Sequence, residues 1–225
     1  MNRGIQFSIS SQLYHKDPQQ TVYGKRLLEH SIEVMYELGF ESFTFKKLAQ
    51  AMKSTEASIY RYFENKHKLL IYLNCWYWEW VHYLIDLHTM NVDDAQKKIK
   101  IAIHELLNAS NQSSMTAYIN ESLLHEIVVI EGVKAFHFHE VDQENDHGAF
   151  RSRKELIEKI AALILEVNPD FKYSKSLAST ISDMADNQIY YAAHLPRLSS
   201  VKGVDKLKQI EAMINQFTFS ILGIH

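Results

Sequence analysis

Apolar residues recur at intervals of three and four along most of the chain, the spacing that gathers them on one face of an α-helix. The pattern predicts a first helix from about Thr21 to Gly39, where glycine takes its usual place after a helix C-terminus. A long helix is predicted from Asn65 to about His88, with aromatic residues on nearly every side, as in a helix buried between neighbours. The expected fold class is all-α, because only seven glycines and three prolines interrupt the helical period.

The second half of the chain continues with amphipathic helices. They are predicted at residues 93–110, 114–128, 152–167, 174–195 and 205–222. The polar stretch Ile130–His147 is expected to be a loop. Two amphipathic helices at the end of a chain can pair with their copies as a four-helix bundle, so a homodimer is expected. The residues predicted at this interface share the apolar faces of the last two helices: Leu177, Ile181, Met184, Ile210, Ile214, Phe217 and Ile221.

Residues 40–63 contain two short helical patterns joined by a few polar residues, which is how a helix-turn-helix looks in sequence. The apolar positions of the first helix follow the order i, i+3, i+4 and i+7: Phe45, Leu48, Ala49 and Met52. In the second helix Ile59 and Phe63 lie four apart and are expected to face inward. Thr44 and Thr55 each precede a helix and are predicted to cap its first turn.

The outer face of the second short helix carries small residues, hydroxyls and one guanidinium. Such a helix can enter the major groove and touch phosphates and base edges together. Arg61 and Lys46 are expected to reach base edges. Lys66 would gain nothing from its own helix dipole, so a phosphate contact is expected, with a solvated lysine as the alternative. The residues predicted at the DNA are Thr44, Lys46, Thr55, Glu56, Ala57, Ser58, Tyr60, Arg61, Tyr62 and Lys66.

The stretch from about Leu27 to Leu70 resembles the tetracycline-repressor (TetR/AcrR-like) family of bacterial regulators. The resemblance lies in an ordered set of residues: Gly39-Phe40, Phe43-Thr44-Phe45, Leu48-Ala49, Ser58-Ile59-Tyr60-Arg61-Tyr62-Phe63, Asn65-Lys66 and Leu69-Leu70. The chain departs from the family at Lys53 and Ser54, where the family usually has glycine and valine. The resemblance implies an N-terminal three-helix helix-turn-helix head, joined by a long helix to a C-terminal helical ligand-binding and dimerisation core. It also implies dimerisation through the final helices.

Three parts of the chain are therefore expected. They are a flexible N-terminal arm at 1–20, a helix-turn-helix DNA-binding domain at 21–68, and a helical ligand-binding and dimerisation domain at 69–225. The arm is either inert or adds phosphate contacts through Arg3 or Lys16.

The charge is unevenly distributed along the chain. The net charge of −3 alone argues against a nucleic-acid binder, but residues 21–70 hold eight Lys and Arg against six acids, while residues 71–225 hold fourteen against twenty. The positive excess thus falls on the DNA-binding motif.

Composition also bears on the compartment. The one cysteine, Cys75, excludes an internal disulfide framework and fits a reducing cytoplasm. A buried small hydrophobe is favoured for it over a redox sensor. No apolar run approaches the ~20 residues that cross a bilayer, and no signal peptide pattern is present, so a cytoplasmic protein with no membrane partner is expected.

Aromatic residues on the long helix are suited to line a cavity. Tyr72, Trp76, Trp80 and Tyr83 form a stripe, for which plain core packing is the alternative. A small apolar or aromatic effector is expected to bind there. The predicted lining is mainly apolar with a few polar groups: Trp76, Trp80, His104, Tyr118, His125 and Phe136.

Catalytic and metal-binding patterns in the sequence are weak. His137, His139 and Glu140 form the densest cluster of possible ligands, but residues i and i+2 of a helix point to different sides. Polar pocket or surface histidines are favoured, and no metal and no cofactor is expected. Phosphate-loop and nucleophile motifs are lacking, so an enzyme is not expected. A helical enzyme using the aromatic cavity and a structural interaction protein stay open as alternatives, and duplex DNA binding separates both from a regulator.

These features together predict a homodimeric transcription regulator that responds to a ligand, with a repressor favoured over an activator. A ligand-independent regulator of the same fold is a further alternative. Two recognition helices one helical turn apart (~34–36 Å) would read a near-palindromic operator in double-stranded DNA.

Overall fold

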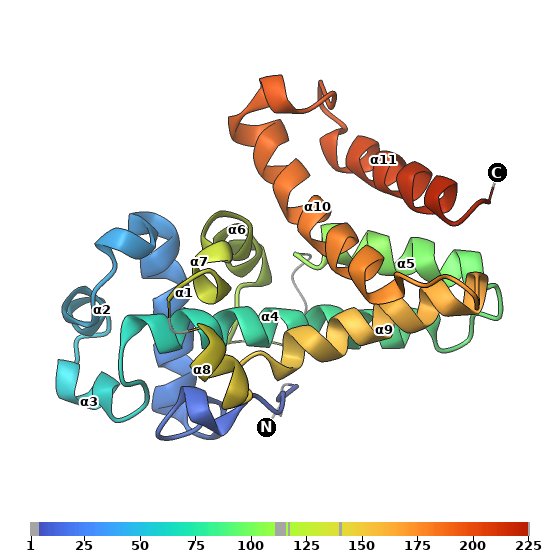
Figure 1. Ribbon diagram of the computed structural model, residues 1–225. Helices are drawn as coiled ribbons and strands as arrows, with labels where there is room; N and C mark the ends of the chain where they lie inside the picture. The colour runs from blue at the N-terminus through green and yellow to red at the C-terminus, as the bar shows by residue number, and fades with distance from the viewer. Residues whose placement is uncertain (1–4, 111–115, 117, 140, 225) are drawn as a thin grey trace. The chain divides into compact units, whose positions relative to one another are not determined.

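The computed structural model describes residues 5–110, 116, 118–139 and 141–224 (Figure 1). The described residues form helices, turns and irregular segments and contain no strand, so the all-α prediction is confirmed. Contacts divide the chain into two compact units. The first unit takes residues 1–79 and 110–152, and the second takes residues 80–109 and 153–225. No described helix combines the length and apolarity that a bilayer crossing requires.

The first unit holds the helix-turn-helix head and the helices packed on it. Its elements are η1 (Ser11–Leu13), η2 (Pro18–Gln20), α1 (Val22–Ser42), α2 (Phe45–Ala51), α3 (Glu56–Tyr60), the first part of α4 (Lys66–Thr89), α6 (Glu121–Glu131), α7 (Val133–Phe136) and α8 (Val141–Asp146). The helix predicted at 114–128 is present as α6 from Glu121, after the capping side chain of Asn120, and its predicted start at residue 114 lies outside the described residues. The predicted loop 130–147 instead contains two short helices, because local turns satisfy its backbone.

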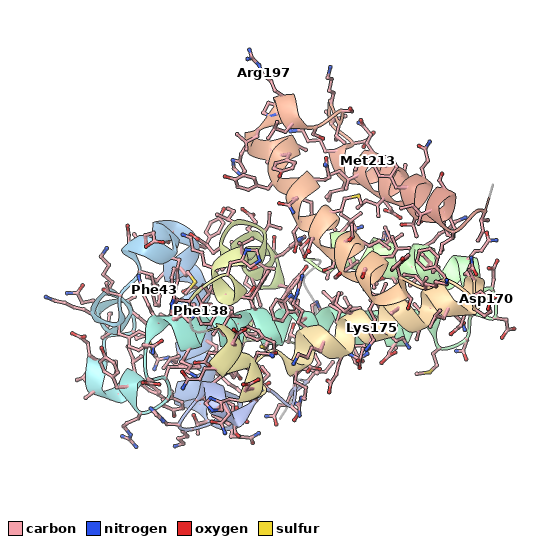
Figure 2. All side chains as sticks on the ribbon, viewed as in Figure 1. Phe43, Phe138, Asp170, Lys175, Arg197 and Met213 are labelled. Atoms are coloured by element: carbon pink, nitrogen blue, oxygen red, sulfur yellow. The ribbon has the colours of Figure 1, made fainter. Side chains whose placement is uncertain are left out.

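Helix α1 begins and ends where the sequence predicts. The Thr21 side chain accepts a hydrogen bond from the backbone N–H of Gly24 at its start. At Gly39 the backbone turns to φ 71°, ψ 159°, a conformation that residues with a side chain avoid, and the regular helix stops there. A short turn follows, and Phe43, fully buried in the head, leads into α2 (Figure 2).

The two short helices of the motif are capped as predicted. The Thr44 hydroxyl accepts from the N–H of Lys47 at 3.2 Å, and the Thr55 hydroxyl accepts from the N–H of Ser58 at 3.3 Å. In the turn between them Lys53 has φ 51°, the left-handed conformation that the family's glycine adopts without strain. The departure at Lys53 therefore leaves the turn in place, at a cost of roughly 1–2 kcal/mol for a residue with a Cβ.

The N-terminal segment is not a free arm over residues 5–20. Leu13 is 1% exposed and Gln19 is 1% exposed. The Gln19 amide donates to the carbonyl of Phe7 at 2.8 Å and accepts from its N–H at 3.0 Å. We call residues 5–20 the N-terminal strap. The prediction of a flexible arm is wrong for these residues. They lack a helical spacing of apolar residues, but apolar and amide contacts to distant residues hold them in place. Arg3 lies outside the described residues.

The second unit consists of the end of α4, α5 (Ala95–Asn108), α9 (Arg151–Val167) from Arg153 onward, α10 (Ser174–His194), η4 (Pro196–Leu198) and α11 (Lys206–Ile221). The four predicted helices of this region are confirmed to within a few residues. Helices α10 and α11 pack against each other and both contact α5. Met213 lies on α11, and Arg197 extends into solvent after α10 (Figure 2).

Candidate functional site

The outer face of α3 is open to solvent. Glu56, Ala57 and Arg61 are exposed, and Tyr60 is 49% exposed, while Ile59 is fully buried beneath them. The helix thus presents a carboxylate, a methyl group, a phenol and a guanidinium together, a set able to contact phosphates and base edges. Thr55 is exposed and Ser58 is half-buried at the start of the same helix, where their hydroxyls lie 3.0 Å apart.

Helix α2 flanks this surface. Thr44 and Lys46 are exposed, and Lys46 forms no hydrogen bond or ion pair with a described residue. Its neighbour Lys47 instead donates to the carbonyl of Ser42 at 2.8 Å. The ring of Phe45 meets the ring of Tyr60 edge-on at 5.1 Å, so α2 positions the exposed phenol of α3.

Tyr62 does not belong to the outer face. It is 5% exposed, its hydroxyl lies 2.8 Å from the hydroxyl of Thr21, and its ring stacks on Tyr23 at 5.6 Å. The prediction of an outward Tyr62 assumed that the helix continues, whereas α3 ends at Tyr60 and the chain then turns inward. Tyr62 therefore ties the end of α3 to the start of α1.

Lys66, predicted at a phosphate, is engaged within the chain. Its ammonium donates to three carbonyls at the end of α1, those of Phe40 at 2.8 Å, Glu41 at 3.0 Å and Phe43 at 3.2 Å. It also lies 4.6 Å from the centre of the Phe40 ring. An ammonium has three hydrogens, so all are engaged within the protein. The charge faces the negative end of α1, where a cation is favourable.

A buried carboxylate from α6 holds the same end of α1 and was not among the predicted site residues. Glu131 is 8% exposed and accepts from the backbone N–H of Phe40 at 2.9 Å. Its other oxygen lies 2.8 Å from the ammonium of Lys134, which also meets Glu41 at 2.9 Å. The hydrogen bonds to Glu131 and then to Glu41 raise the pKa of Lys134, so its ammonium stays charged at neutral pH. A Glu at the C-terminal end of a helix is unfavourable for that helix's dipole, and this was the available signal.

The structure brings two of the predicted ligand-binding residues together in the first unit. Burial raises the pKa of the Tyr118 phenol to about 12, against a weaker opposing effect of a hydrogen bond with Trp76. The Tyr118 hydroxyl also donates towards the carbonyl of Ile5 at 3.2 Å, and the Phe7 ring meets the Trp76 ring edge-on at 5.2 Å. The strap thus covers the surface formed by Trp76 and Tyr118.

Two other predicted residues lie on different sides of α4. His125 stacks on Tyr77 at 5.4 Å, and the ring of Phe136 is 6.1 Å from that of Trp78. Burial lowers the pKa of His125 to about 4, so its imidazole is neutral at pH 7. Its Nε2 has no hydrogen-bond partner among the described residues.

The remaining predicted ligand-binding residues belong to the second unit. Trp80 is buried and donates its indole N–H to the carbonyl of Ala109 at 2.9 Å. His104 is half-exposed on α5, with its Nδ1 3.2 Å from the carboxylate of Glu211 on α11.

Most residues predicted at the dimer interface are buried within the single chain. Leu177 is 7% exposed, Ile210 is 1% exposed, and Ile181 and Ile214 are fully buried. The prediction took every apolar position as available to a partner, whereas α10 and α11 cover one face of each other and of α5. Met184 is half-buried, and the two exposed members of the set are Phe217 at 47% and Ile221 at 54%.

The histidine cluster and the cysteine do not form a site in the described part of the chain. No group of three possible ligands there is arranged to hold a metal ion. His137 and His139 are exposed, and Glu140 lies outside the described residues. Cys75 is buried, donates to the carbonyl of Ala149 at 3.1 Å, and has a pKa raised by burial, so it stays a thiol.

A capped pair of helices with an open polar face on the second defines a DNA-binding regulator of the helix-turn-helix class. Residues 27–73 match the family model described as "Bacterial regulatory proteins, tetR family". This segment is a DNA-binding domain of the tetR family, which confirms the resemblance seen in the sequence. Such a domain points to a DNA-binding regulator rather than to an enzyme.

Solved structures agree in fold. The fatty acid degradation regulator FadR from Bacillus halodurans has a TM-score of 0.60 and 15% identity, and covers 86% of this chain and 92% of its own. AibR in complex with isovaleryl coenzyme A and operator DNA has a TM-score of 0.52 and 14% identity, covering 85% and 97%. Apo AibR gives a TM-score of 0.52 and 14% identity, covering 85% and 96%. No curated protein sequence matches the chain significantly.

Proposed function

We propose that the chain is a cytoplasmic transcription repressor that binds operator DNA as a homodimer and leaves it when a small apolar or aromatic ligand binds. The observation that carries the DNA-binding part is the open face of α3, with Tyr60 and Arg61 exposed inside a segment that matches the tetR domain. Two such faces about one helical turn apart, ~34–36 Å, would read a near-palindromic operator.

The effector surface is proposed at Trp76 and Tyr118 of the first unit. Two aromatic rings with a phenol hydroxyl fit the usual make-up of a small-molecule site, mainly apolar with a few polar groups. AibR has been solved with isovaleryl coenzyme A, and FadR is a regulator of fatty acid degradation. Acyl thioesters with short or long apolar chains are therefore the first compounds to test.

The homodimer is proposed to form through α11. Phe217 and Ile221 lie four residues apart on one face, with half-buried Met213 in line with them. An exposed apolar stripe of this kind on a terminal helix is suited to pack against its copy.

The route from effector to DNA is proposed to pass through the end of α1. Glu131 of α6 holds the N–H of Phe40, and Lys66 at the start of α4 holds the carbonyl of the same residue. A ligand that shifts α4 or α6 would therefore move the end of α1 with them. Such a ligand releases DNA only if it binds the two head arrangements with different affinity.

Selection of bound fragments from genomic DNA, followed by fluorescence anisotropy on the recovered site, tests the proposal. The protein should bind the recovered site in preference to a scrambled duplex, and replacing Tyr60 and Arg61 by Ala should remove the preference. An effector from an acyl coenzyme A panel should weaken binding ~5–150-fold, the range of typical allosteric coupling. Unchanged binding by the double variant would show that α3 is not the recognition helix.

A reporter gene placed behind the selected site separates a repressor from an activator. Expression should rise when the protein is removed from the cell and when the effector is added. Expression that falls on removal would assign the protein as an activator.

A further inference from the structure

The N-terminal strap connects the two surfaces that the proposed function needs. It begins at Ile5 against Tyr118, passes Trp76 at Phe7, and reaches Tyr62, just after the end of α3. We propose that the strap is an internal competitor of the effector, which must displace residues 5–8 from Trp76 and Tyr118 and thereby loosens the support of α3. This inference rests on the proposed function, because it takes the Trp76–Tyr118 surface as the effector site.

Phe7 occupies the place that an aromatic or apolar ligand would take. Its ring lies 5.2 Å from the ring of Trp76 at an angle of 71°, the edge-to-face contact that aromatic pairs favour. Trp76 itself is fully buried. The hydroxyl of Tyr118 is engaged by the carbonyl of Ile5 at 3.2 Å and by Gln19 at 3.2 Å. A ligand that packs on this side of Trp76 therefore replaces a phenyl group and a carbonyl of the same chain.

The first part of the strap is held more weakly than the second. Ile5 and Phe7 are half-buried and Ser8 is exposed, whereas Ile9 is 5% exposed and Leu13 is 1% exposed. Arg151 donates to both the hydroxyl, at 3.2 Å, and the carbonyl of Ser8, a contact open to solvent. Partly exposed apolar groups contribute less than fully buried ones. Residues 5–8 can therefore leave while residues 9–20 stay on the domain.

Gln19 transmits the loss of Phe7 to the rest of the strap. Its side-chain amide is buried and forms two hydrogen bonds to the backbone of Phe7, at 3.0 Å and 2.8 Å. Once Phe7 leaves, the Gln19 amide nitrogen loses the Phe7 carbonyl, while its oxygen keeps only the Tyr118 hydroxyl. A buried polar group without its partner is costly. The turn Pro18–Gln20 must then move, although it is packed tightly on α1: a Cβ at Gly24 would lie 2.3 Å from the carbonyl oxygen of Pro18.

The same turn sets the contact with the recognition helix. Shortly before it, the N–H of His15 donates to the carbonyl of Tyr62 at 2.8 Å. Tyr14 adds an edge-on ring contact to Tyr72 at 5.9 Å. Thr21, immediately after the turn, lies 2.8 Å from the hydroxyl of Tyr62. Movement of Pro18–Gln20 therefore acts on both polar contacts that hold Tyr62 directly behind Arg61.

Hydrogen exchange of the full-length protein tests this link without any effector. In Phe7→Ala the amide of His15 should exchange faster, by about two- to tenfold, the factor expected for loss of one aromatic pair. Binding of the apolar dye 8-anilinonaphthalene-1-sulfonate should strengthen, and operator affinity should fall, by similar factors. Ser11→Ala, an exposed position on the same strap, serves as the matched control and should change none of the three.

Gly24→Ala approaches the strap from its other end. The added methyl group displaces Pro18, so it should also speed exchange at His15 and weaken operator binding, with α1 intact by circular dichroism. If Phe7→Ala and Gly24→Ala both fold and both leave exchange at His15 and operator affinity unchanged, the strap is only a structural cover and the proposal is overturned. A wild-type protein that binds no selected operator is a different result, which removes the proposed function itself.

Discussion

Replacing Lys66 by Met tests whether this lysine caps α1 or contacts a phosphate. Methionine keeps the length of the side chain but removes the ammonium, which leaves three carbonyls at the end of α1 without their donor. Hydrogen bonds to a charged group contribute about 1.5–3 kcal/mol each when the group is buried. The carbonyl of Glu41 is exposed and those of Phe40 and Phe43 are partly buried, so water replaces much of the loss, and about 2 kcal/mol remains.

Thermal unfolding and the salt dependence of operator binding are the two measurements. At about 2–4 °C per kcal/mol for a chain of this size, Lys66→Met should lower Tm by about 4–8 °C. Its operator affinity should fall with salt as steeply as that of the wild type, because no phosphate contact is lost. Lys46→Met is the matched control, because this exposed lysine has no partner among the described residues. Its Tm should be unchanged, and the slope of log affinity against log salt concentration should decrease in magnitude by about 0.9.

The reverse pattern would refute the capping role. If Lys66→Met lowers the salt slope by about 0.9 and leaves Tm unchanged, the ammonium reaches a phosphate in the complex. The three internal hydrogen bonds would then contribute nothing measurable to stability.

Three further changes follow from the structure. Arg61→Ala should weaken the base preference at one operator position by about 1–3 kcal/mol, measured by competition between operators that differ at single bases. An unaltered preference would exclude a base contact by Arg61. Phe217→Asp with Ile221→Asp should leave a folded monomer by light scattering, since both side chains are exposed in the single chain; a persistent dimer would place the interface elsewhere. The pKa of His125 is about 4 in the folded state, below its value in the unfolded state, so the unfolded state binds more protons. The free energy of unfolding should therefore fall as the pH drops, by about 2 kcal/mol between pH 7 and pH 5. His125→Phe should remove that part of the pH dependence, and chemical denaturation at the two pH values decides it.

The helix boundaries could be predicted because their signals are local. Thr44, Thr55 and Gly39 act on backbone groups within four residues, so their roles are visible in a short window of sequence. The spacing of the apolar residues likewise predicted which side of α3 faces outward. The identity of the DNA-binding head therefore follows from the sequence alone.

The contacts that the sequence could not predict join residues far apart along the chain. The acceptors of Lys66 lie 23–26 residues earlier, and Glu131 holds an N–H 91 residues away. A polar side chain at a helix end looks the same in sequence whether it meets DNA, water or a carbonyl. The period of α11 shows that Ile214 is apolar, but not whether this chain or a second copy covers it.

Contacts of the strap span much of the chain, and this sets an order of folding. The hydroxyl of Tyr118 meets a carbonyl 113 residues earlier, and Arg151 meets Ser8 across 143 residues. A domain emerges from the ribosome N-terminus first, at ≈ 5–20 residues per second, and contacts of long sequence separation form slowly. Residues 5–8 are therefore synthesised long before their partners Tyr118 and Arg151 and dock only after them. A nascent head made of α1 to α3 has to form before its own N-terminal strap can close on it.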